Sequence, residues 1–356
     1  MTNRDYSMRG ENAKFATESG LASAQWYHTD LDRKEIKLLM KRSNAPAIRD
    51  TIIWLGLMMV FALIAIALTP SWWSLPFWLS YGVLYGSASD SRWHECGHGT
   101  AFKTQWMNNV VYHIASFFMI RNPVSWKWSH TRHHTDTIIV GRDPEIAVMR
   151  PPVLARVIAN FFGIFDSIDG IKAMLSNAAG KISDDVKSYV PETEQAKITG
   201  IARIWLAIYL ATLIAAIVLQ SIIPFLLIGL PRLYGAWHHV MTGLLQHGGL
   251  AENVIDHRLN SRTVLMNPIS RFIYWNMNYH VEHHMFPMVP YHALPALHEK
   301  IKHDLPVATP SIAHGFREMW PALKRQLHNE DYFIKRELPA TAKPYREDLH
   351  IFVPHN

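Results

Sequence analysis

Two long uncharged stretches dominate the pattern of apolar and polar positions along the chain. Residues 51–86 and residues 204–231 contain no Asp, Glu, Lys or Arg. A helix of about 20 apolar residues crosses a lipid bilayer. Each stretch is therefore long enough for two crossings if it folds back near its middle.

Both stretches have a break at the expected place. The first contains TPSWW at residues 69–73, where proline ends a helix and tryptophan favours the membrane interface. The second contains QSIIP at residues 220–224, a weaker turn signal. We therefore predict an all-α integral membrane protein with spans at 49–69, 72–92, 201–220 and 222–243. The alternative, two buried helical hairpins of a soluble protein, is disfavoured because uncharged runs of this length are rare in soluble folds.

The placement of positive charge predicts the orientation. Neither turn carries Lys or Arg, whereas the first 50 residues hold nine. By the positive-inside rule, both termini and the loop 93–200 face the cytoplasm of a multi-pass protein, in the inner membrane if the source is bacterial. This divides the chain into a cytoplasmic segment 1–48, a membrane and metal domain 49–310 and a cytoplasmic tail 311–356.

Composition adds a few constraints. The net charge of +6 suits anionic lipid or an acidic protein partner, and we expect no nucleic-acid partner. The single cysteine, Cys96, excludes an internal disulfide. The first residues are polar, so we expect no secretory signal and expect the first span to direct insertion. Residues 161–182 are amphipathic, and we expect them to lie on the membrane surface or to pack as an ordinary helix on the cytoplasmic cap.

Histidines provide the chemistry-bearing pattern. The chain has 21, and eight of them fall into the three groups HECGH, HTRHH and HVEHH. Residues three or four apart share one side of a helix, so each group presents its rings together. The eight residues are His94, His98, His130, His133, His134, His280, His283 and His284.

So many rings point to metal binding. A buried imidazole nitrogen needs a polar partner, and a metal ion provides one. Imidazole suits Fe, Zn, Cu and Ni, and about four protein ligands per ion is usual. Eight rings therefore imply two metal ions.

A ninth ligand is expected near the end of the fourth span. His247 lies on the same cytoplasmic side as the three groups and is followed by two glycines. His238 and His239 compete for this role, but we interpret them as residues in interfacial packing or in ordinary hydrogen bonds. Isolated histidines are interpreted as surface or helix-face residues: His113, His292, His298 and His303.

The order H-x-x-x-H, H-x-x-H-H, H-x-x-H-H around four spans resembles the membrane fatty acid desaturase superfamily, over roughly residues 50–310. NYHVEHHMFPMVP is most similar to the last histidine box of acyl-lipid and sphingolipid desaturases. The resemblance implies a di-iron centre at the cytoplasmic membrane face, with the eight histidines as ligands and His247 as the best match to a further one. Some relatives hold an asparagine near the irons through water, and Asn276 is the candidate here.

The same resemblance implies dioxygen as co-substrate and an external source of electrons. No cytochrome b5 domain with a His-Pro-Gly-Gly haem motif is found in this sequence. We therefore expect a separate carrier, a ferredoxin, a rubredoxin or a cytochrome b5 with its reductase, which docks on the basic face by charge complementarity. The tail 311–356 is expected to pack under the catalytic face or to bind this carrier.

Other residues near the boxes have supporting roles. The carboxylates are expected either to orient histidines or to be solvated: Glu95, Asp143, Glu145 and Glu282. The tryptophans are expected to line an acyl tunnel or to form an interfacial belt: Trp72, Trp73, Trp126 and Trp128. Arg232 ends an uncharged run and is expected to bind a substrate carboxylate or headgroup, or else to snorkel to the membrane edge.

The function that follows is a dioxygen-dependent di-iron oxidoreductase that desaturates an acyl chain of a membrane lipid. No catalytic residue is expected beyond the metal ligands. Hydroxylation of an acyl chain stays open, as does oxidation of a small amphiphile of the dihydrorhizobitoxine or rhizopine type. A metal transporter is disfavoured, because its polar groups would lie along the spans near the midplane.

Overall fold

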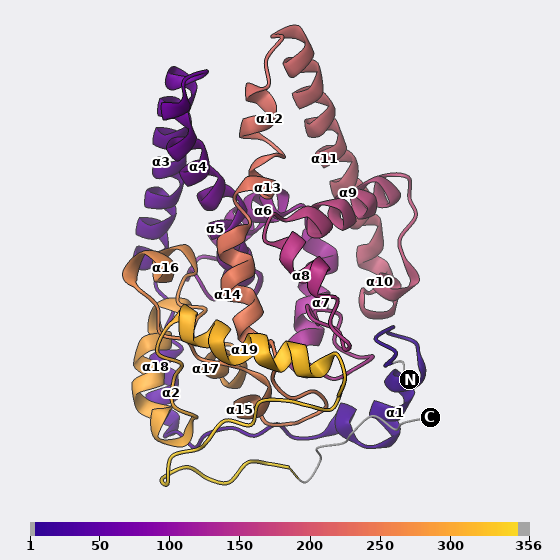
Figure 1. Ribbon diagram of the computed structural model, residues 1–356, viewed down its shortest axis with the longest axis vertical. Helices are drawn as coiled ribbons and strands as arrows, with labels where there is room; N and C mark the ends of the chain where they lie inside the picture. The colour runs from indigo at the N-terminus through magenta and orange to yellow at the C-terminus, as the bar shows by residue number, and fades with distance from the viewer. Residues whose placement is uncertain (1–3, 348–356) are drawn as a thin grey trace.

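The computed structural model describes residues 4–347 as helices joined by loops (Figure 1). Within these residues the only strand-like pairings are two isolated bridges, Thr263 with Tyr279 and Val264 with Thr309. The predicted all-α class is confirmed.

Helices of very different length follow one another along the chain. The first half of the described chain contains α1 (Glu11–Glu18), α2 (Arg33–Leu39), α3 (Asn44–Leu68), α4 (Leu75–Gly86), α5 (Ala88–Gly97), α6 (Gln105–Met119), α7 (Pro123–Thr135), α8 (Leu154–Asn160), α9 (Ile164–Ala178) and α10 (Asp184–Tyr189). The second half contains α11 (Glu192–Val218), α12 (Ile223–Leu227), α13 (Pro231–Tyr234), α14 (Trp237–His247), α15 (His257–Asn260), α16 (Pro268–Ile273), α17 (His280–Met285), α18 (Leu294–Ile301) and α19 (Ile312–Gln326). Short 3₁₀ turns are η1 (Leu21–Ser23), η2 (Trp72–Ser74), η3 (Tyr291–Ala293) and η4 (Lys302–Asp304).

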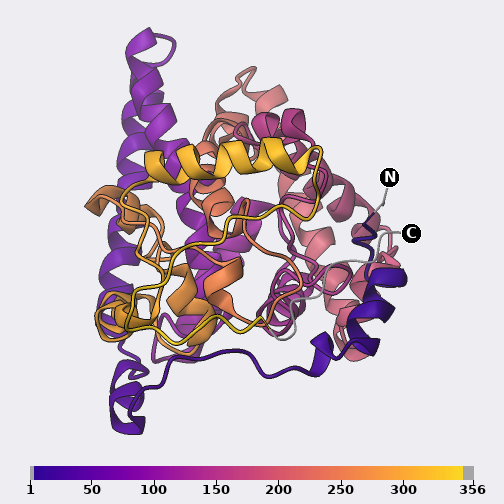
Figure 2. The ribbon, with the colours of Figure 1, turned by 60° about the horizontal axis from the view of Figure 1, so that its bottom comes forward.

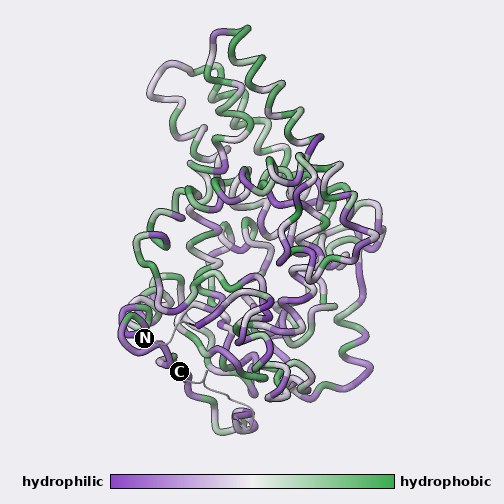
Figure 3. The backbone as a smooth tube through the Cα atoms, turned by 90° about the vertical axis from the view of Figure 1, so that its right-hand side faces the viewer, coloured by the Kyte–Doolittle hydropathy of each residue, from purple (hydrophilic) through white to green (hydrophobic). Residues whose placement is uncertain are grey.

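The molecule has an upper part of long helices and a lower part of short ones. The α3–α4 hairpin and the α11–α12 hairpin stand at the top of Figure 1, whereas α1, α2, α15, α17, α18 and α19 lie in the lower half. The upper part is mostly apolar along the backbone, and the lower part is mixed and polar (Figure 3). The structure thus separates an apolar part with the long helices from a more polar part with the short ones.

Two stretches of the described chain are long and apolar enough to cross a membrane, by length and composition: Arg33–Leu68, which contains α3, and Glu192–Val218, which is α11. Both carry large apolar side chains on the outside, for example Ile52 and Leu63 on α3 and Ile204 and Ile217 on α11. A soluble protein rarely exposes such continuous apolar surface, because it is costly in water.

The other two predicted spans are not single long helices. The turn at 69–73 is confirmed, with α3 ending at Leu68 and η2 following it. The segment 72–92 then forms α4 and the first half of α5, which meet at Ser87. The segment 222–243 forms three short helices, α12 to α14, because Gly229 adopts a left-handed φ of 93° and Pro231 starts a new helix.

Close backbone approach fixes α4 against the start of α14. A Cβ atom added to Gly235 would lie 1.7 Å from the carbonyl oxygen of Gly82, so only glycine fits there. The hydroxyl of Ser87 spans the same junction, donating to the Gly235 carbonyl and accepting the His239 backbone N–H at 3.0 Å. This contact positions α14, which carries His247, relative to α5, which carries His94.

Both ends of the described chain wrap the lower part. Figure 2 shows α19 and the chain after it crossing this face, while the segment from α1 to α2 runs along its edge. The wrapping is hydrogen-bonded: Tyr27 N–H donates to the Ile255 carbonyl at 2.9 Å, and Ile334 N–H donates to the Gly249 carbonyl at 2.9 Å. The tail therefore packs on the lower part as far as residue 347, and the rest of it, 348–356, lies outside the described residues.

The amphipathic segment 161–182 forms α9, which lies between the upper and lower parts in Figure 1. One side of α9 exposes Ile164, Ile168, Ile171 and Leu175, whereas Met174 is buried. An exposed apolar stripe at this height is what a helix on a membrane surface presents.

Candidate metal centre and its cavity

The structure gathers all nine predicted histidines into two adjacent groups in the lower part. In each group, one ring nitrogen per residue lies within 4.8 Å of the corresponding nitrogens of the other members. The first group contains His94, His98, His130, His134 and His283. The second group contains His133, His247, His280 and His284.

Four helices supply these rings, α5 with its C-cap, α7, α14 and α17. Helix α7 contributes to both groups, because His130 and His134 lie one turn apart while His133 points to the neighbouring group. Helix α17 divides its histidines in the same way, with His283 in the first group. Residues four apart therefore stay together and residues adjacent in sequence separate, which is why two H-x-x-H-H sequences build two sites.

The ring nitrogens converge in the manner of metal ligands. In the first group the Nε2 atoms of His98 and His130 are 3.0 Å apart, and those of His130 and His134 are 3.1 Å apart. In the second group Nε2 of His280 lies 3.0 Å from Nε2 of His247 and 3.0 Å from that of His284. Two nitrogens bound at right angles to one ion, at about 2.1 Å each, lie about 3 Å apart.

Protonation and burial fit the same interpretation. Both ring nitrogens of buried His94 have no hydrogen-bond partner among the described residues. Burial lowers the pKa of His98 to about 3 and that of His247 to about 3, so these rings are neutral at pH 7. Neutral imidazole is the form that binds a metal ion. The residues present thus fit a pair of metal ions.

Carboxylates and carbonyls hold the far nitrogens of several rings. His130 Nδ1 lies 2.8 Å from Glu145 Oε2, and His247 Nδ1 donates to the Asn260 carbonyl at 2.7 Å. Such bonds fix the tautomer and aim Nε2 at the metal position. Burial raises the pKa of Glu145 to about 7, although the nearby His133 and the Ser129 hydroxyl lower it. The predicted orienting role of Glu145 agrees with this geometry.

Glu95 lies under the first group. Its Oε1 is 3.4 Å from Nδ1 of His94 and 3.7 Å from Nδ1 of His283. Its Oε2 accepts hydrogen bonds from the Tyr291 backbone N–H at 3.1 Å and the Thr100 hydroxyl at 3.3 Å. Burial raises the pKa of Glu95 to about 8 against the effect of these two bonds. Glu95 is thus a buried carboxyl group between two candidate ligands.

Glu282 behaves differently from the prediction. It is fully buried, but it binds Nδ1 of His298 and the Thr263 hydroxyl and none of the nine histidines. It therefore fastens α17 to α18 and to the chain near Thr263. Glu282 is therefore not a solvated carboxylate, and it does not orient a candidate ligand directly. Its partners, Thr263 and His298, lie outside the local sequence pattern on which the prediction was based.

Four further histidines of the described chain lie outside the two groups. His238 Nε2 is 3.2 Å from the Ser270 hydroxyl, which agrees with the predicted hydrogen-bonded role. His239 is buried beside Arg232. His113 and His303 are exposed, as expected for surface histidines.

Two other candidates, Asn276 and Arg232, are not members of the two histidine groups. Asn276 accepts a hydrogen bond from Arg271 at 3.0 Å and donates one to the Tyr291 carbonyl at 3.1 Å, and these contacts hold it away from a direct bond to the nine histidines. Arg232 is only 1% exposed and pairs with Asp166 at 3.2 Å, so it does not snorkel. The expected substrate-binding role of Arg232 has no support from its position, since its charge is already paired.

One histidine near the centre was not predicted. His257 is buried, its ring lies 5.0 Å from that of His284, and it stacks on Trp26 at 4.2 Å. In the sequence it stands alone between polar residues, so spacing carried no signal. The N-terminal segment thereby packs, through Trp26 and His257, beside the second group.

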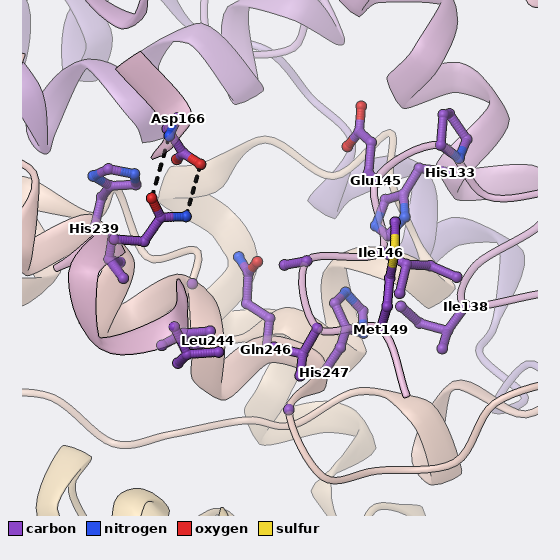
Figure 4. A pocket seen from close by; sticks show the side chains of 18 of the residues that line it. His133, Ile138, Glu145, Ile146, Met149, Asp166, His239, Leu244, Gln246 and His247 are labelled. Atoms are coloured by element: carbon purple, nitrogen blue, oxygen red, sulfur yellow. Dashed lines mark hydrogen bonds between the residues drawn. The ribbon is translucent and has the colours of Figure 1, made fainter. Parts of the chain in front are cut away.

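One cavity of about 640 Å³ reaches both groups. Figure 4 shows His133, Glu145 and His247 at one end of it and Asp166 and His239 at the other. Its apolar wall comes from α8, α14 and the loop before α8, with Val153, Val157, Val240, Leu244, Ile146, Val148 and Met149.

Only one of the four singled-out tryptophans lines this cavity. The Trp126 ring stacks on His130 with centroids 4.3 Å apart. Trp72 and Trp73 are 83% and 77% exposed at the tip of the α3–α4 hairpin and do not line the cavity. The tunnel hypothesis is therefore wrong for these two, and their position suits the interfacial belt.

An all-helical protein with two histidine groups at one cavity has the histidine-box arrangement. The sequence profile of the family described as "Fatty acid desaturase" matches residues 70–316, and the chain belongs to this family. Over 284 residues it is 23% identical to the acyl-lipid omega-3 desaturase (cytochrome b5) of the endoplasmic reticulum of Arabidopsis thaliana, covering 74% of this chain and 72% of that protein.

Shorter matches are more similar. The chain is 39% identical over 87 residues to an endoplasmic reticulum omega-6 fatty acid desaturase, isozyme 1, of Glycine max, covering 24% of this chain and 22% of that protein. It is 29% identical over 129 residues to a Delta(12) acyl-lipid conjugase (11E,13E-forming) of Impatiens balsamina, covering 34% and 32%. The chain thus spans about a third or less of these two relatives.

Proposed function

We propose that this protein is a membrane-bound, dioxygen-dependent di-iron desaturase that introduces a C=C bond into an acyl chain of a lipid. The observation that carries the proposal is the convergence of five and four imidazoles on two points reached by a single cavity. Family membership and the acyl-lipid desaturases among the relatives support the same chemistry.

The nine histidines would hold the two irons, which when bound supply the activation of dioxygen and the removal of hydrogen from an unactivated C–H bond. Desaturation converts a CH₂–CH₂ unit, one O₂, two electrons and two protons into CH=CH and two water molecules. The chain itself orients ligands through Asp143, Glu145 and Asn260 and walls the site with Trp126. No nucleophilic side chain is required.

We further propose that the chain crosses the membrane four times. Helices α3 and α11 are complete spans, while α4 with the start of α5, and α12 with α13 and the start of α14, return through the bilayer as bent or broken segments. Broken helices are tolerated where their free backbone groups are covered by protein. The apolar residues of the upper part (Figure 3), many of them exposed, support this arrangement, in which both termini and the histidine groups would lie on the cytoplasmic side.

Electrons would come from a separate small carrier, a ferredoxin, a rubredoxin or a cytochrome b5 with its reductase. The name of the Arabidopsis relative includes cytochrome b5, which supports a protein carrier of this type. The basic composition, with a net charge of +6, favours an acidic partner.

The test combines metal content and turnover. The protein is purified in detergent, iron and zinc are quantified, and reduced ferredoxin, oxygen and membrane lipids are added before mass spectrometry. About two irons per chain and an acyl chain lighter by two hydrogen atoms would support the proposal. Gain of one oxygen atom instead would make the protein a hydroxylase, and zinc or no metal would overturn the di-iron assignment.

Matched variants sharpen the test. His280→Ala removes a second-group ring and is expected to lower the iron content towards one per chain and to abolish turnover. His303→Ala removes an exposed histidine of the same part of the molecule and should change neither. Equal loss of iron in both variants would show that the histidine groups are not the iron sites.

A further inference from the structure

The cavity that reaches the histidines has a charged end. Asp90, Arg121, Asp166 and His239 line it there, beside Trp93. Figure 4 places Asp166 and His239 across the cavity from His133 and His247. A site that held only a hydrocarbon chain would gain nothing from charged groups, since each costs desolvation energy when water leaves.

Arg121 is the group with unused capacity at this end. Its guanidinium lies over the Trp93 ring at 4.9 Å and stands 3.8 Å from Asp90 and 3.7 Å from Asp166. Within residues 4–347 its side chain makes no hydrogen bond, and it is 37% exposed. A guanidinium has five N–H donors, so Arg121, which lines the cavity, keeps donors that no hydrogen bond of the described residues uses.

Arg232 and Asp166 are in contrast largely satisfied. Their ion pair at 3.2 Å is reinforced by the Asn160 amide, which donates to Asp166 at 2.9 Å. Their charges cancel to a first approximation. The groups left to face a ligand are then Arg121 and Asp90, whose carboxylate has no hydrogen bond from a side chain in the described part of the chain.

The charge balance selects the ligand. Arg121 and Asp90 together are neutral, and their side chains are 37% and 17% exposed. A head with one net charge would be attracted by one of these residues and repelled by the other. A head with a positive and a negative group, or with an uncharged donor and acceptor, would satisfy both residues at once.

We propose that Arg121 and Asp90 form the polar-head site of the substrate cavity, and that the head is net-neutral, with an acceptor facing Arg121 and a donor facing Asp90. The assignment rests on the proposed function in that it names the substrate class of the same cavity. The apolar wall of Val240, Leu244 and Met149 then takes the chain.

The head site is close to the metal centre. Trp93, on which Arg121 lies, is 6.5 Å from the ring of His130, centroid to centroid. A single indole ring therefore separates the charged end from a candidate ligand.

The experiment compares three probes with one dodecyl chain and different heads: dodecanoate, dodecylammonium and the zwitterionic N-dodecylglycine. Binding is measured by thermal shift and equilibrium titration on the iron-loaded protein in lipid nanodiscs. The native protein is expected to bind N-dodecylglycine about tenfold tighter than either charged probe. Equal binding of the three probes would overturn the proposal.

Charge variants give the decisive result. Asp90→Asn leaves Arg121 uncompensated and should shift preference to dodecanoate, whereas Arg121→Met should shift it to dodecylammonium. Arg156→Met is the matched control, because Arg156 lines the cavity elsewhere and is paired with Asp169 at 2.6 Å. The Arg156→Met variant should bind the three probes in the same order of affinity as the native protein. The assignment would be contradicted if the order in Asp90→Asn and Arg121→Met did not follow the change in charge.

Two further outcomes separate this proposal from the function. Arg121→Lys and Asp90→Glu keep the charges and should keep the order, which guards against loss through misfolding. If the affinities for the probes follow the predicted order while no probe or lipid is oxidised, the head-site assignment is supported and the desaturase proposal fails. If lipids are desaturated while the affinities do not depend on the charge of the head, the head-site assignment fails and the proposed function is supported.

Discussion

The Nδ1 atom of His133 lies 2.8 Å from Oδ2 of Asp143, and the same oxygen accepts the Ile138 backbone N–H at 2.7 Å. The other oxygen, Oδ1, accepts the Glu145 backbone N–H at 2.8 Å. One buried carboxylate thus fixes a candidate metal ligand and the loop that follows α7. Burial lowers the pKa of His133, but the negative charge of Asp143 raises it above its usual value overall.

Asp143→Asn should weaken the second metal position. The asparagine amide has one acceptor oxygen in place of two and carries no negative charge. It therefore cannot accept hydrogen bonds from the His133 ring and from both backbone N–H groups, and His133 loses its orientation. The expected result is a tenfold to hundredfold loss of affinity, roughly, for the second iron, measured by iron titration. Asp169→Asn, an exposed carboxylate paired with Arg156, is the control. Unchanged iron affinity in Asp143→Asn would refute the orienting role.

Gly235→Ala should destabilise the whole protein. The added methyl group would meet the backbone oxygen of Gly82 at 1.7 Å, and backbone cannot move aside as a side chain can. Overpacking of this kind costs about 3 kcal/mol, seen as a lower thermal midpoint. Gly200→Ala in α11 meets nothing within 4 Å and should be neutral or stabilising by about 0.5–1 kcal/mol. Similar midpoints for the two variants would mean that α4 and the α13–α14 junction are further apart.

Asp304 should make stability depend on acid pH. It accepts hydrogen bonds from the Tyr27 hydroxyl at 2.6 Å and the Thr29 hydroxyl at 2.7 Å, and it pairs with Arg258. Burial raises its pKa, but these bonds and the Arg258 charge lower it below the usual value overall. A lowered pKa contributes stability above the unfolded value of about 3.9, and this contribution is lost as pH falls through the folded value.

The matching measurement compares the native protein with Asp304→Asn. The variant should have a lower thermal midpoint at pH 7, and the gap should narrow as pH falls below about 4. Asp30→Asn removes an exposed carboxylate that pairs with Lys343 and should show a small gap at every pH. A gap for Asp304→Asn that stays constant down to pH 3 would contradict the assigned role.

The proposed topology predicts opposite labelling of two exposed serines. Ser71 lies at the tip of the α3–α4 hairpin, and Ser188 lies in α10 of the lower part. In intact spheroplasts an impermeant maleimide should label Ser71→Cys at once and Ser188→Cys only after permeabilisation. Native Cys96 should stay silent, because it is buried and burial raises the pKa of its thiol. Labelling of both cysteines before permeabilisation would overturn the orientation.

Local sequence pattern determined much of this protein. The absence of charge over 51–86 and 204–231 predicted α3 and α11, because a helix in lipid must be apolar on every side. The spacing within H-x-x-H-H determined which rings share a group, since residues four apart on one helix always face the same way. His247 was found from its position at the end of a span.

Tertiary structure decided what depends on residues distant in sequence. Arg232 pairs with Asp166, which is 66 residues away in the sequence. Glu282 pairs with His298, which is 16 residues away. A local sequence pattern carries no information on such pairs. The same holds for His257 beside His284. The breaks in the fourth predicted span come from Gly229 and Pro231, and the hydropathy of this segment does not predict them.

The sequence by itself therefore determined the helical class, the family and the nine candidate ligands, because apolarity and helical spacing are local properties of the chain. Only the folded chain decided that these ligands divide into groups of five and four, and that one cavity joins them to a charged end at Arg121 and Asp90. Both outcomes depend on how α5, α7, α14 and α17 pack. That packing follows from contacts such as Gly82 with Gly235, which exist only when the whole chain is folded.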